Sequence, residues 1–290
     1  MQMICNWKEK LKILSLSLLA VAALASCQEE NDPTTVYVSS YPVYLLVKEV
    51  VKDIQPIEIL TPSGMEPHDY EISARKVAAI HDGCALFLNG LGLESWGEVL
   101  PHALQSKTIT LSDSITPLSL DGILDPHIWL SPLNAIAELG AIKDGLIRLN
   151  PKNRAAYETN YGEALKNIEA LDKECLDKVS SFANHSICVA HAAFGYLCDR
   201  YDLSQIYVKG LTPEAEPTAK ELEATIEQIR EHNIKVVFVE ELAEQDIATK
   251  ISQETGARLE TLPTMEEGDE ADDYCSIMRE IFEKLEVACK

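Results

Sequence analysis

The stretch PKNRAAYETNYGEALKNIEALDKECLDKVSSF, residues 151–182, decides how the chain is organised. Its apolar side chains recur every three to five residues from Tyr157 to Phe182, and most of the other positions are charged or polar. This spacing predicts one amphipathic helix about 45 Å long, because a helix rises about 1.5 Å per residue. A rigid helix of this length is typical of a connector between two lobes. The alternative is a pair of helices with a break near Gly162, since an internal glycine costs about 1 kcal/mol.

Short apolar runs alternate with helical patterns on both sides of this helix. Before it they are VYVSS (36–40), PIEIL (56–60), CALFLN (84–89) and KTITL (107–111), and after it SICVA (186–190), QIYVK (205–209), KVVFVE (235–240) and RLETL (258–262). Strands that alternate with helices predict parallel sheets covered by helices. We therefore predict an α/β fold of two Rossmann-like lobes. The expected boundaries are an N-terminal lobe at 36–150, a linker helix at 151–183 and a C-terminal lobe at 184–290.

Three histidines each lie just past an apolar run, in SGMEPHDYE, DPHIWLSP and VAHAAFGY. His68 follows the predicted strand 56–60, His127 lies late in the first half, and His191 directly follows 186–190. Ligands of open α/β sheets bind beyond the carboxyl ends of the strands. If the two lobes face each other, the three imidazoles therefore meet in the cleft between them. Three neutral imidazoles make a ligand set for a divalent metal, zinc above all.

The other histidines and the acidic groups have simpler interpretations. His81, His102, His185 and His232 lie near predicted helix ends, where histidines are usually surface groups. The acidic run at 266–273 is typical of a solvated loop followed by a helix amino terminus. Glu71 and Glu240 are candidates to accept hydrogen bonds from metal-binding imidazoles. Trp96 and Trp129 are expected to be packing residues.

The first 26 residues have the features of an export signal. Three lysines precede an apolar stretch at 13–24, which is followed by Leu-Ala-Ser-Cys ending at Cys27. The stretch is too short for a spanning helix. Leu-Ala-Ser-Cys resembles a bacterial lipobox, which implies a lipoprotein signal peptide at 1–26 and lipid on Cys27. Residues 27–35 then form a tether. The alternative is an ordinary secretory signal with an incidental cysteine. We expect an exported lipoprotein, anchored in the membrane and facing the periplasm or the cell exterior.

Charge and cysteine content exclude several kinds of partner and site. The formal net charge of −22 argues against nucleic acid and anionic membrane surfaces as ligands. The chain contains no C-x-x-C, so a thiolate zinc site has no local support. Exported proteins form disulfides, and the pairing of the six cysteines beyond Cys27 stays open.

Six segments occur in an order typical of one known family. They are GMEPHDYEIS, FLNGLGLESW, DPHIWLSPLNA, VAHAAFGYLCDRYDL, GLTPEAEPTAKEL and VVFVEE. Together they resemble the metal-binding solute receptors of bacterial ABC transporters for zinc and manganese, the ZnuA/TroA-like group. The resemblance implies metal ligands at His68, His127 and His191, an interlobe helix near 151–182, and delivery of metal to a membrane permease.

The sequence departs from this family in two places. The family often has a fourth ligand, an aspartate in the second lobe, where this chain has Thr261-Leu262-Pro263. Water, Glu240 or an acid from 266–273 are the candidates to replace it. Many zinc-specific members carry a histidine-rich loop before the second ligand, whereas residues 112–124 contain no histidine.

The expected function is that of a monomeric, non-enzymatic receptor that binds zinc and passes it to an ABC permease. A manganese receptor is the second choice, because manganese prefers oxygen ligands. A zinc hydrolase, with water bound to a three-histidine zinc, is an alternative, although no H-E-x-x-H segment is present. A surface metal-scavenging or adhesin lipoprotein is another, suggested by the acidic residues after Cys27. Three imidazoles of pKa about 6.5 predict that zinc affinity falls steeply below about pH 6.

Overall fold

The structure, a computed structural model, describes residues 34–211, 216–240, 246–269 and 271–290. The predicted signal peptide, Cys27 and nearly all of the tether lie outside the described residues. The chain from Pro33 to Lys290 clusters into one compact unit. Among the helices that the structure describes, none combines the length and apolar character needed to cross a membrane.

Four parallel strands from the first half of the chain form one sheet. They are β1 (Val36–Val38), β2 (Ile57–Ile59), β3 (Ala85–Leu88) and β4 (Thr108–Thr110), in the order β2-β1-β3-β4. The helices of this half are α2 (Tyr41–Val51), α3 (Ala74–Asp82) and α4 (Pro132–Leu149). β1 and β3 are buried throughout, as apolar strands in a helix-covered parallel sheet should be. The loop that leaves the carboxyl end of β2 carries His68.

The second half of the chain repeats this architecture with its own four strands. They are β7 (Ser186–His191), β8 (Ser204–Lys209), β9 (Val236–Val239) and β10 (Arg258–Thr261), in the order β10-β9-β7-β8, and all pair in parallel. The helices of this half are α6 (Gly195–Tyr201), α7 (Ala219–Glu231), α8 (Asp246–Thr255) and α9 (Tyr274–Cys289). All eight predicted strands therefore occur. His191 is the last residue of β7, so its ring stands at the carboxyl end of this sheet.

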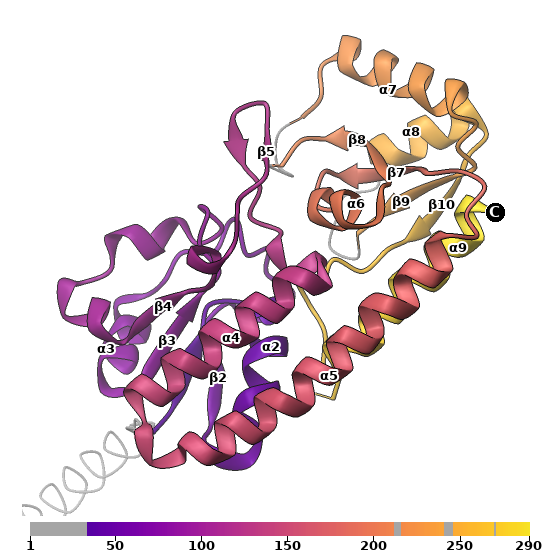
Figure 1. Cartoon of the computed structure of the whole chain (residues 1–290). Coiled ribbons are helices and arrows are strands. Elements are labelled where there is room, and N and C mark those ends of the chain that lie inside the picture. Colours follow the sequence, from indigo (N-terminus) through magenta and orange to yellow (C-terminus); the bar gives the residue numbers. More distant parts are fainter. Residues whose placement is uncertain (1–33, 212–215, 241–245, 270) are drawn as a thin grey trace, which may run out of the picture. The chain divides into compact units, whose positions relative to one another are not determined.

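A single long helix, α5 (Arg154–Val179), connects the halves, and α9 lies alongside it (Figure 1). The alternative of two helices is wrong, since α5 continues through Gly162 without a break. A Cβ added at Gly162 would have no atom within 4 Å, so no close contact requires a glycine there. Asp172 fixes the far part of α5 to α6, because its carboxylate accepts hydrogen bonds from Arg200 Nε (2.9 Å) and Tyr201 OH (3.0 Å). The helix is thus held against both halves along its length.

The connections contain short elements that the sequence analysis did not predict. The antiparallel hairpin β5 (Ser119–Leu120) and β6 (Ile123–Leu124) lies in the connection between β4 and His127. Its turn residues, Asp121 and Gly122, both have positive φ, as the Asp-Gly signal of a tight hairpin requires. The 3-10 helices are η1 (Lys52–Ile54), η2 (Ser95–Val99), η3 (His102–Lys107), η4 (Leu111–Ser114), η5 (Ile128–Leu130) and η6 (Pro151–Asn153).

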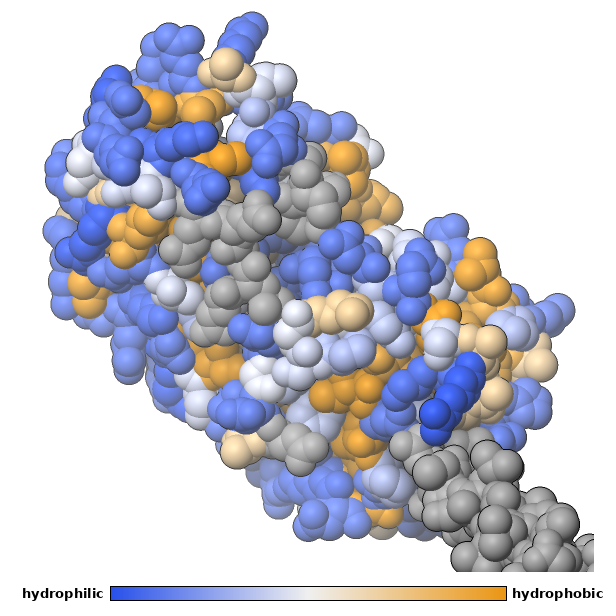
Figure 2. Space-filling view, turned by 180° about the vertical axis from the view of Figure 1, so that it is seen from behind, coloured by the Kyte–Doolittle hydropathy of each residue, from blue (hydrophilic) through white to orange (hydrophobic). Residues whose placement is uncertain are grey.

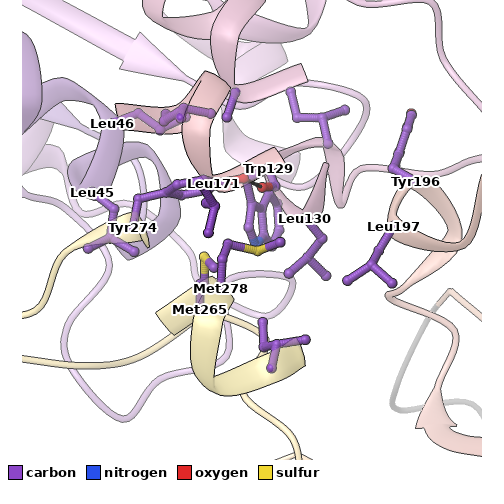
Figure 3. Packing of buried hydrophobic residues seen from close by; sticks show 14 of the residues in the cluster. Leu45, Leu46, Trp129, Leu130, Leu171, Tyr196, Leu197, Met265, Tyr274 and Met278 are labelled. Carbon is purple, nitrogen blue, oxygen red and sulfur yellow. Dashed lines mark hydrogen bonds between the residues drawn. The ribbon is translucent and has the colours of Figure 1, made fainter. Parts of the chain in front are cut away.

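One hydrophobic cluster reaches from the first sheet to the second. Figure 3 shows a part of it from close by. Trp129 lies within it, almost fully buried, among side chains from α2, α5, α6 and α9. The predicted packing roles of Trp96 and Trp129 agree with their burial. This packing fixes the segment that carries His127, two residues before Trp129. The face drawn in Figure 2 is mostly hydrophilic, and its hydrophobic residues form several small groups.

Candidate metal centre

The three predicted histidines meet, although they come from distant parts of the chain. His68 lies in the loop after β2, His127 directly precedes η5, and His191 ends β7. Their ring centroids are 5.4 Å (His68–His127), 5.9 Å (His68–His191) and 4.7 Å (His127–His191) apart. One ring nitrogen of each lies within 4.8 Å of the others. The first half therefore supplies two imidazoles and the second half supplies one.

The spacing of these nitrogens fits a small tetrahedral cation. Zinc–imidazole bonds are about 2.0–2.1 Å long, so two nitrogens bound to one tetrahedral zinc lie about 3.3–3.4 Å apart. The Nε2 atoms of His68 and His127 are 3.4 Å apart. Burial, followed by the charge of His191, lowers the pKa of His68 to about 4. Its ring is therefore neutral at physiological pH and available as a ligand.

His127 is completely buried and is held by a carboxylate behind it. Its Nδ1 lies 2.8 Å from Asp125 Oδ1, which also accepts from the His127 backbone N at 2.9 Å. Burial lowers the pKa of His127 well below its usual value and raises the pKa of Asp125 to about 7. An Nδ1–H donated to Asp125 leaves Nε2 free to bind metal. Gly195 makes room for this arrangement, because a Cβ there would stand 2.5 Å from Asp125 Oδ2.

His191 is nearly as buried but has oxygen atoms near both ring nitrogens. Its Nδ1 lies 3.2 Å from Glu240 Oε1, and its Nε2 lies 3.1 Å from the Leu211 carbonyl oxygen. Burial opposes a charge on this ring, but the adjacent Glu240 and then Glu266 outweigh burial and raise the pKa of His191 to about 9. The ring is therefore protonated at neutral pH. A metal that binds it must displace the proton and one of these contacts.

A glutamate of the 266–273 run, which was among the candidates for a fourth ligand, also faces the histidines. Glu266 is only 6% exposed, and its Oε1 lies 3.9 Å from His127 Nε2. Among the described residues this oxygen has no hydrogen-bond partner, whereas Oε2 accepts from Thr264 Oγ1 at 2.7 Å. The preceding Met265 has φ +64°, a strained conformation that directs the chain at this point. The interpretation of 266–273 as a solvated loop is thus wrong for Glu266.

The segment that carries Glu266, Leu262–Asp269, is fastened to the first half of the chain. Trp129 Nε1 donates to the Thr264 carbonyl oxygen at 2.7 Å. Tyr41 OH, on α2, donates to the Asp269 carbonyl oxygen at 2.7 Å. Gly268 permits this approach, since a Cβ there would stand 2.5 Å from the Tyr41 hydroxyl oxygen. Contacts between residues far apart in sequence therefore place Glu266 beside the imidazoles.

The remaining predicted groups lie elsewhere or act differently. His81, His102, His185 and His232 are all exposed, as expected of surface histidines. Glu240 contacts His191, in the place predicted for an acceptor. Glu71 is exposed, and none of the contacts described for it reaches an imidazole.

Comparison with known proteins gives the family. A family model described as "Zinc-uptake complex component A periplasmic", ZnuA, matches residues 36–288. The chain belongs to the ZnuA family. This confirms the resemblance drawn from the six sequence segments, and the family takes part in zinc uptake rather than catalysis.

Individual relatives agree with this assignment. The chain is 30% identical over 302 residues to the high-affinity zinc uptake system protein ZnuA of Bacillus subtilis, covering 94% of this chain and 95% of that protein. It is 31% identical over 301 residues to the zinc-binding lipoprotein AdcA of Streptococcus pneumoniae, covering 96% of this chain. The match spans only 60% of AdcA.

A solved structure confirms the predicted fold class. The laminin-binding protein Lmb of Streptococcus agalactiae superposes with a TM-score of 0.83 at 30% identity, over 89% of this chain and 100% of that chain. Two parallel sheets with covering helices and one long helix are thus the fold of the family, as the alternation of strands and helices predicted.

Proposed function

We propose that this protein is a non-enzymatic receptor that binds Zn²⁺ outside the cytoplasm and delivers it to the permease of an ABC importer. The observation that carries the proposal is the convergence of three imidazoles, two buried and one half-buried, at a spacing that suits zinc. Membership of a zinc-uptake family supports the same metal and the same kind of partner. Zinc is the transported cargo, so the site has to bind it and later release it.

In this proposal the ligands are His68, His127 and His191, with Glu266 as the fourth. Nitrogen and carboxylate oxygen ligands are both suited to zinc, and four protein ligands make a closed tetrahedral site. A hydrolytic zinc site keeps one position open for water. The buried, unpartnered Glu266 Oε1 stands near His127 Nε2, where it would take that position. The arrangement therefore favours a binding protein over a zinc hydrolase.

Metal titration of the purified mature protein, prepared without a His tag, tests the proposal. We expect one tight zinc per chain, and a loss of affinity of more than about 100-fold for His68→Ala, His127→Ala or His191→Ala, beyond the range for supporting groups. His102→Ala, an exposed histidine, is the matched control and should leave zinc binding unchanged. Two equal tight sites, or a control as damaging as His191→Ala, would contradict this assignment.

We also propose the lobe boundaries 36–150, 151–183 and 184–290, a lipid anchor at Cys27, and a monomeric receptor. The sheets and α5 support the boundaries, and the Leu-Ala-Ser-Cys sequence supports the anchor, together with the name lipoprotein given to AdcA. Metabolic labelling with a fatty acid tests the anchor, because Cys27→Ala should abolish the label. Sedimentation of the mature protein tests the oligomeric state.

Adhesion is a second candidate function, and one observation favours it. The structurally similar Lmb is described as a bifunctional protein with adhesin and metal-transporting activity. Binding of the purified protein to immobilised laminin, with bovine serum albumin as the control surface, tests this. Equal binding to both surfaces would exclude it.

A further inference from the structure

Asn89 is a fully buried asparagine directly after β3, and its side chain is bonded to the segment that carries His127. Its Nδ2 donates to the Pro126 carbonyl oxygen at 2.8 Å and to the Gly90 carbonyl oxygen at 3.1 Å. Because both partners are carbonyl oxygens, the amide has to face them with its N–H groups. Among the described residues Asn89 Oδ1 has no hydrogen-bond partner. A buried amide with one unpaired atom lowers stability, so its place calls for an explanation other than packing.

The carbonyl oxygen that Asn89 binds also closes a tight turn around His127. This oxygen of Pro126 accepts from Ile128 N at 2.8 Å. His127, the central residue, has φ −79° and ψ 47°, which is near the conformation of an inverse γ-turn. The peptide unit between Pro126 and His127 is held at both ends. Its N–H donates to Asp125 Oδ1 at 2.9 Å, and its oxygen accepts from Asn89.

Glu94 fixes Asn89 in turn. Its carboxylate is buried, with Oε1 accepting from the Asn89 backbone N at 2.8 Å and Oε2 from Gly90 N at 2.9 Å. Two successive backbone N–H groups that converge on one anion form a nest. Burial raises the pKa of Glu94, and the hydrogen bonds from these N–H groups oppose that rise. On its other side Asn89 is held by its carbonyl oxygen, which accepts from Ser112 N at 3.0 Å.

We propose that Asn89 is a positioning residue for zinc binding: held by Glu94, its amide fixes the turn that directs the His127 ring towards the metal. This inference rests on the proposed zinc site, because Asn89 acts through His127. Two ring nitrogens that share a tetrahedral zinc lie about 3.3–3.4 Å apart, so a small rotation of the turn would move His127 Nε2 out of reach. The first sheet thus orients this ring through hydrogen bonds to the backbone.

The first test compares variants that keep every metal ligand. Asn89→Ala removes both hydrogen bonds of the amide, and we expect Zn²⁺ affinity, measured by competition with a chelator, to fall about tenfold. Glu94→Gln keeps the shape but turns an NH₂ group towards a backbone N–H, and we expect about a threefold decrease. Asn160→Ala is the matched control, because Asn160 Nδ2 also donates to a backbone carbonyl, that of Val50, at 3.0 Å. It should leave Zn²⁺ affinity unchanged.

Thermal unfolding of the metal-free proteins shows whether each variant folds, and Glu94→Gln carries the comparison if Asn89→Ala does not. Co²⁺ then reports the geometry of the site, because its visible spectrum depends on how its ligands are arranged. At saturating Co²⁺ the spectrum of Asn89→Ala should differ from that of the wild type, whereas the spectrum of Asn160→Ala should not. A residue that only stabilises the fold would leave the spectrum of the loaded protein unchanged.

Two double-mutant cycles show whether Asn89 acts through His127. In the His127→Ala background no ring is left to position, so Asn89→Ala should cost no further Zn²⁺ affinity. In the His191→Ala background it should keep its effect of about tenfold. The proposal is overturned if Asn89→Ala leaves affinity or the Co²⁺ spectrum unchanged, or if its effect is equal in the two backgrounds. If instead His127→Ala itself keeps tight zinc, the proposed zinc site fails, and that outcome is visible without any Asn89 variant.

Discussion

His127 and His191 come from opposite halves of the molecule, and their environments make the first ring neutral and the second positively charged. Each ring is almost fully buried, and each has a carboxylate beside Nδ1, Asp125 at 2.8 Å and Glu240 at 3.2 Å. The pKa of His127 is nevertheless lowered, whereas that of His191 is raised to about 9.

The pKa of His127 is lowered by its complete burial and then by the charges of His191 and His68, and no carboxylate outweighs them. Asp125 is itself driven towards its neutral form, with a pKa raised by burial to about 7, and it stands alone beside His127 Nδ1. His191 has both Glu240 and Glu266 as acidic neighbours. A carboxylate beside Nδ1 therefore does not by itself determine whether a buried histidine is charged. The first half presents rings ready for metal, and the second half presents a ring that must lose a proton.

The largest expected effect separates these two rings. His127→Ala and His191→Ala should both weaken zinc binding more than about 100-fold, because each removes a direct metal bond. Only His191→Ala should also lower the number of protons released per zinc, since His191 alone of the three histidines is protonated at neutral pH. Calorimetry with excess zinc in two buffers of different ionisation enthalpy measures the protons released. Equal proton release from the two variants would contradict the assigned charges.

The pH dependence of zinc binding sharpens the comparison. A group that is protonated in the metal-free protein must lose its proton to bind zinc, so affinity rises with pH up to the pKa of that group. For His191 this window ends near a pH of about 9, and between about pH 6 and pH 8 one proton changes the affinity about tenfold per pH unit. Glu266, with its raised pKa, adds to this slope if it binds zinc.

The pKa values of the three rings predict a pH profile that differs from the one expected from the sequence. His68, with a pKa of about 4, and His127, with a lowered pKa, carry no proton to displace at about pH 6. The loss of affinity should therefore begin well above about pH 6 and involve fewer than three protons. Zinc dissociation constants from about pH 9 to about pH 5 decide the matter. A profile that is flat above about pH 7 and steep with three protons below about pH 6 would restore the simpler view.

Replacing Glu266 by glutamine should have the next largest effect. Glutamine keeps the shape and the hydrogen bond with Thr264 but is a poor zinc ligand, so we expect zinc affinity to fall about 10- to 100-fold. Glu267→Gln is the matched control on the neighbouring residue. Zinc titrations of both variants by chelator competition measure the effect, and equal behaviour of the two would exclude Glu266 as a ligand.

Asp125→Asn should have a smaller effect on zinc affinity. Asparagine can still accept from His127 Nδ1 through its carbonyl oxygen, but the negative charge behind the ring is lost. We expect about a tenfold decrease in affinity, as is typical for a group that supports a metal-binding histidine. Asp113→Asn, a surface aspartate in the same part of the chain, is the control. An unchanged affinity for Asp125→Asn would show that Asp125 does not orient His127.

Some of the features behind these predictions can be predicted from the sequence, and others cannot. The long helix was predictable because its apolar positions repeat with the helical period. Gly162 does not interrupt this repeat or the helix. The three histidines were visible because each follows an apolar run, and strand ends of a parallel sheet gather at one edge.

Other features of the site were not predictable from local sequence. Glu266 stands in an acidic run that is typical of a solvated loop. Its burial depends on two long-range contacts, which join Trp129 to Thr264 and Tyr41 to Asp269 across 135 and 228 positions of the sequence. The hairpin at 119–124 did carry an Asp-Gly turn signal, which a strand search restricted to longer apolar runs misses.

The smallest expected effect concerns Tyr41, which holds the Leu262–Asp269 segment from the opposite half of the molecule. Tyr41→Phe removes the hydroxyl that donates to the Asp269 carbonyl oxygen and keeps the ring in its place. If this contact positions Glu266, zinc affinity should fall about threefold, within the range for the loss of one hydrogen bond. The matched control is Tyr44→Phe on the same helix.

A double-mutant cycle distinguishes positioning from a general loss of stability. In the Glu266→Gln background there is no carboxylate left to position, so Tyr41→Phe should change zinc affinity no further. A hydroxyl that only stabilises the fold would instead have the same effect in both backgrounds. Zinc dissociation constants of the four proteins give the coupling directly. Additive effects would mean that the Tyr41 hydroxyl of α2 does not position Glu266.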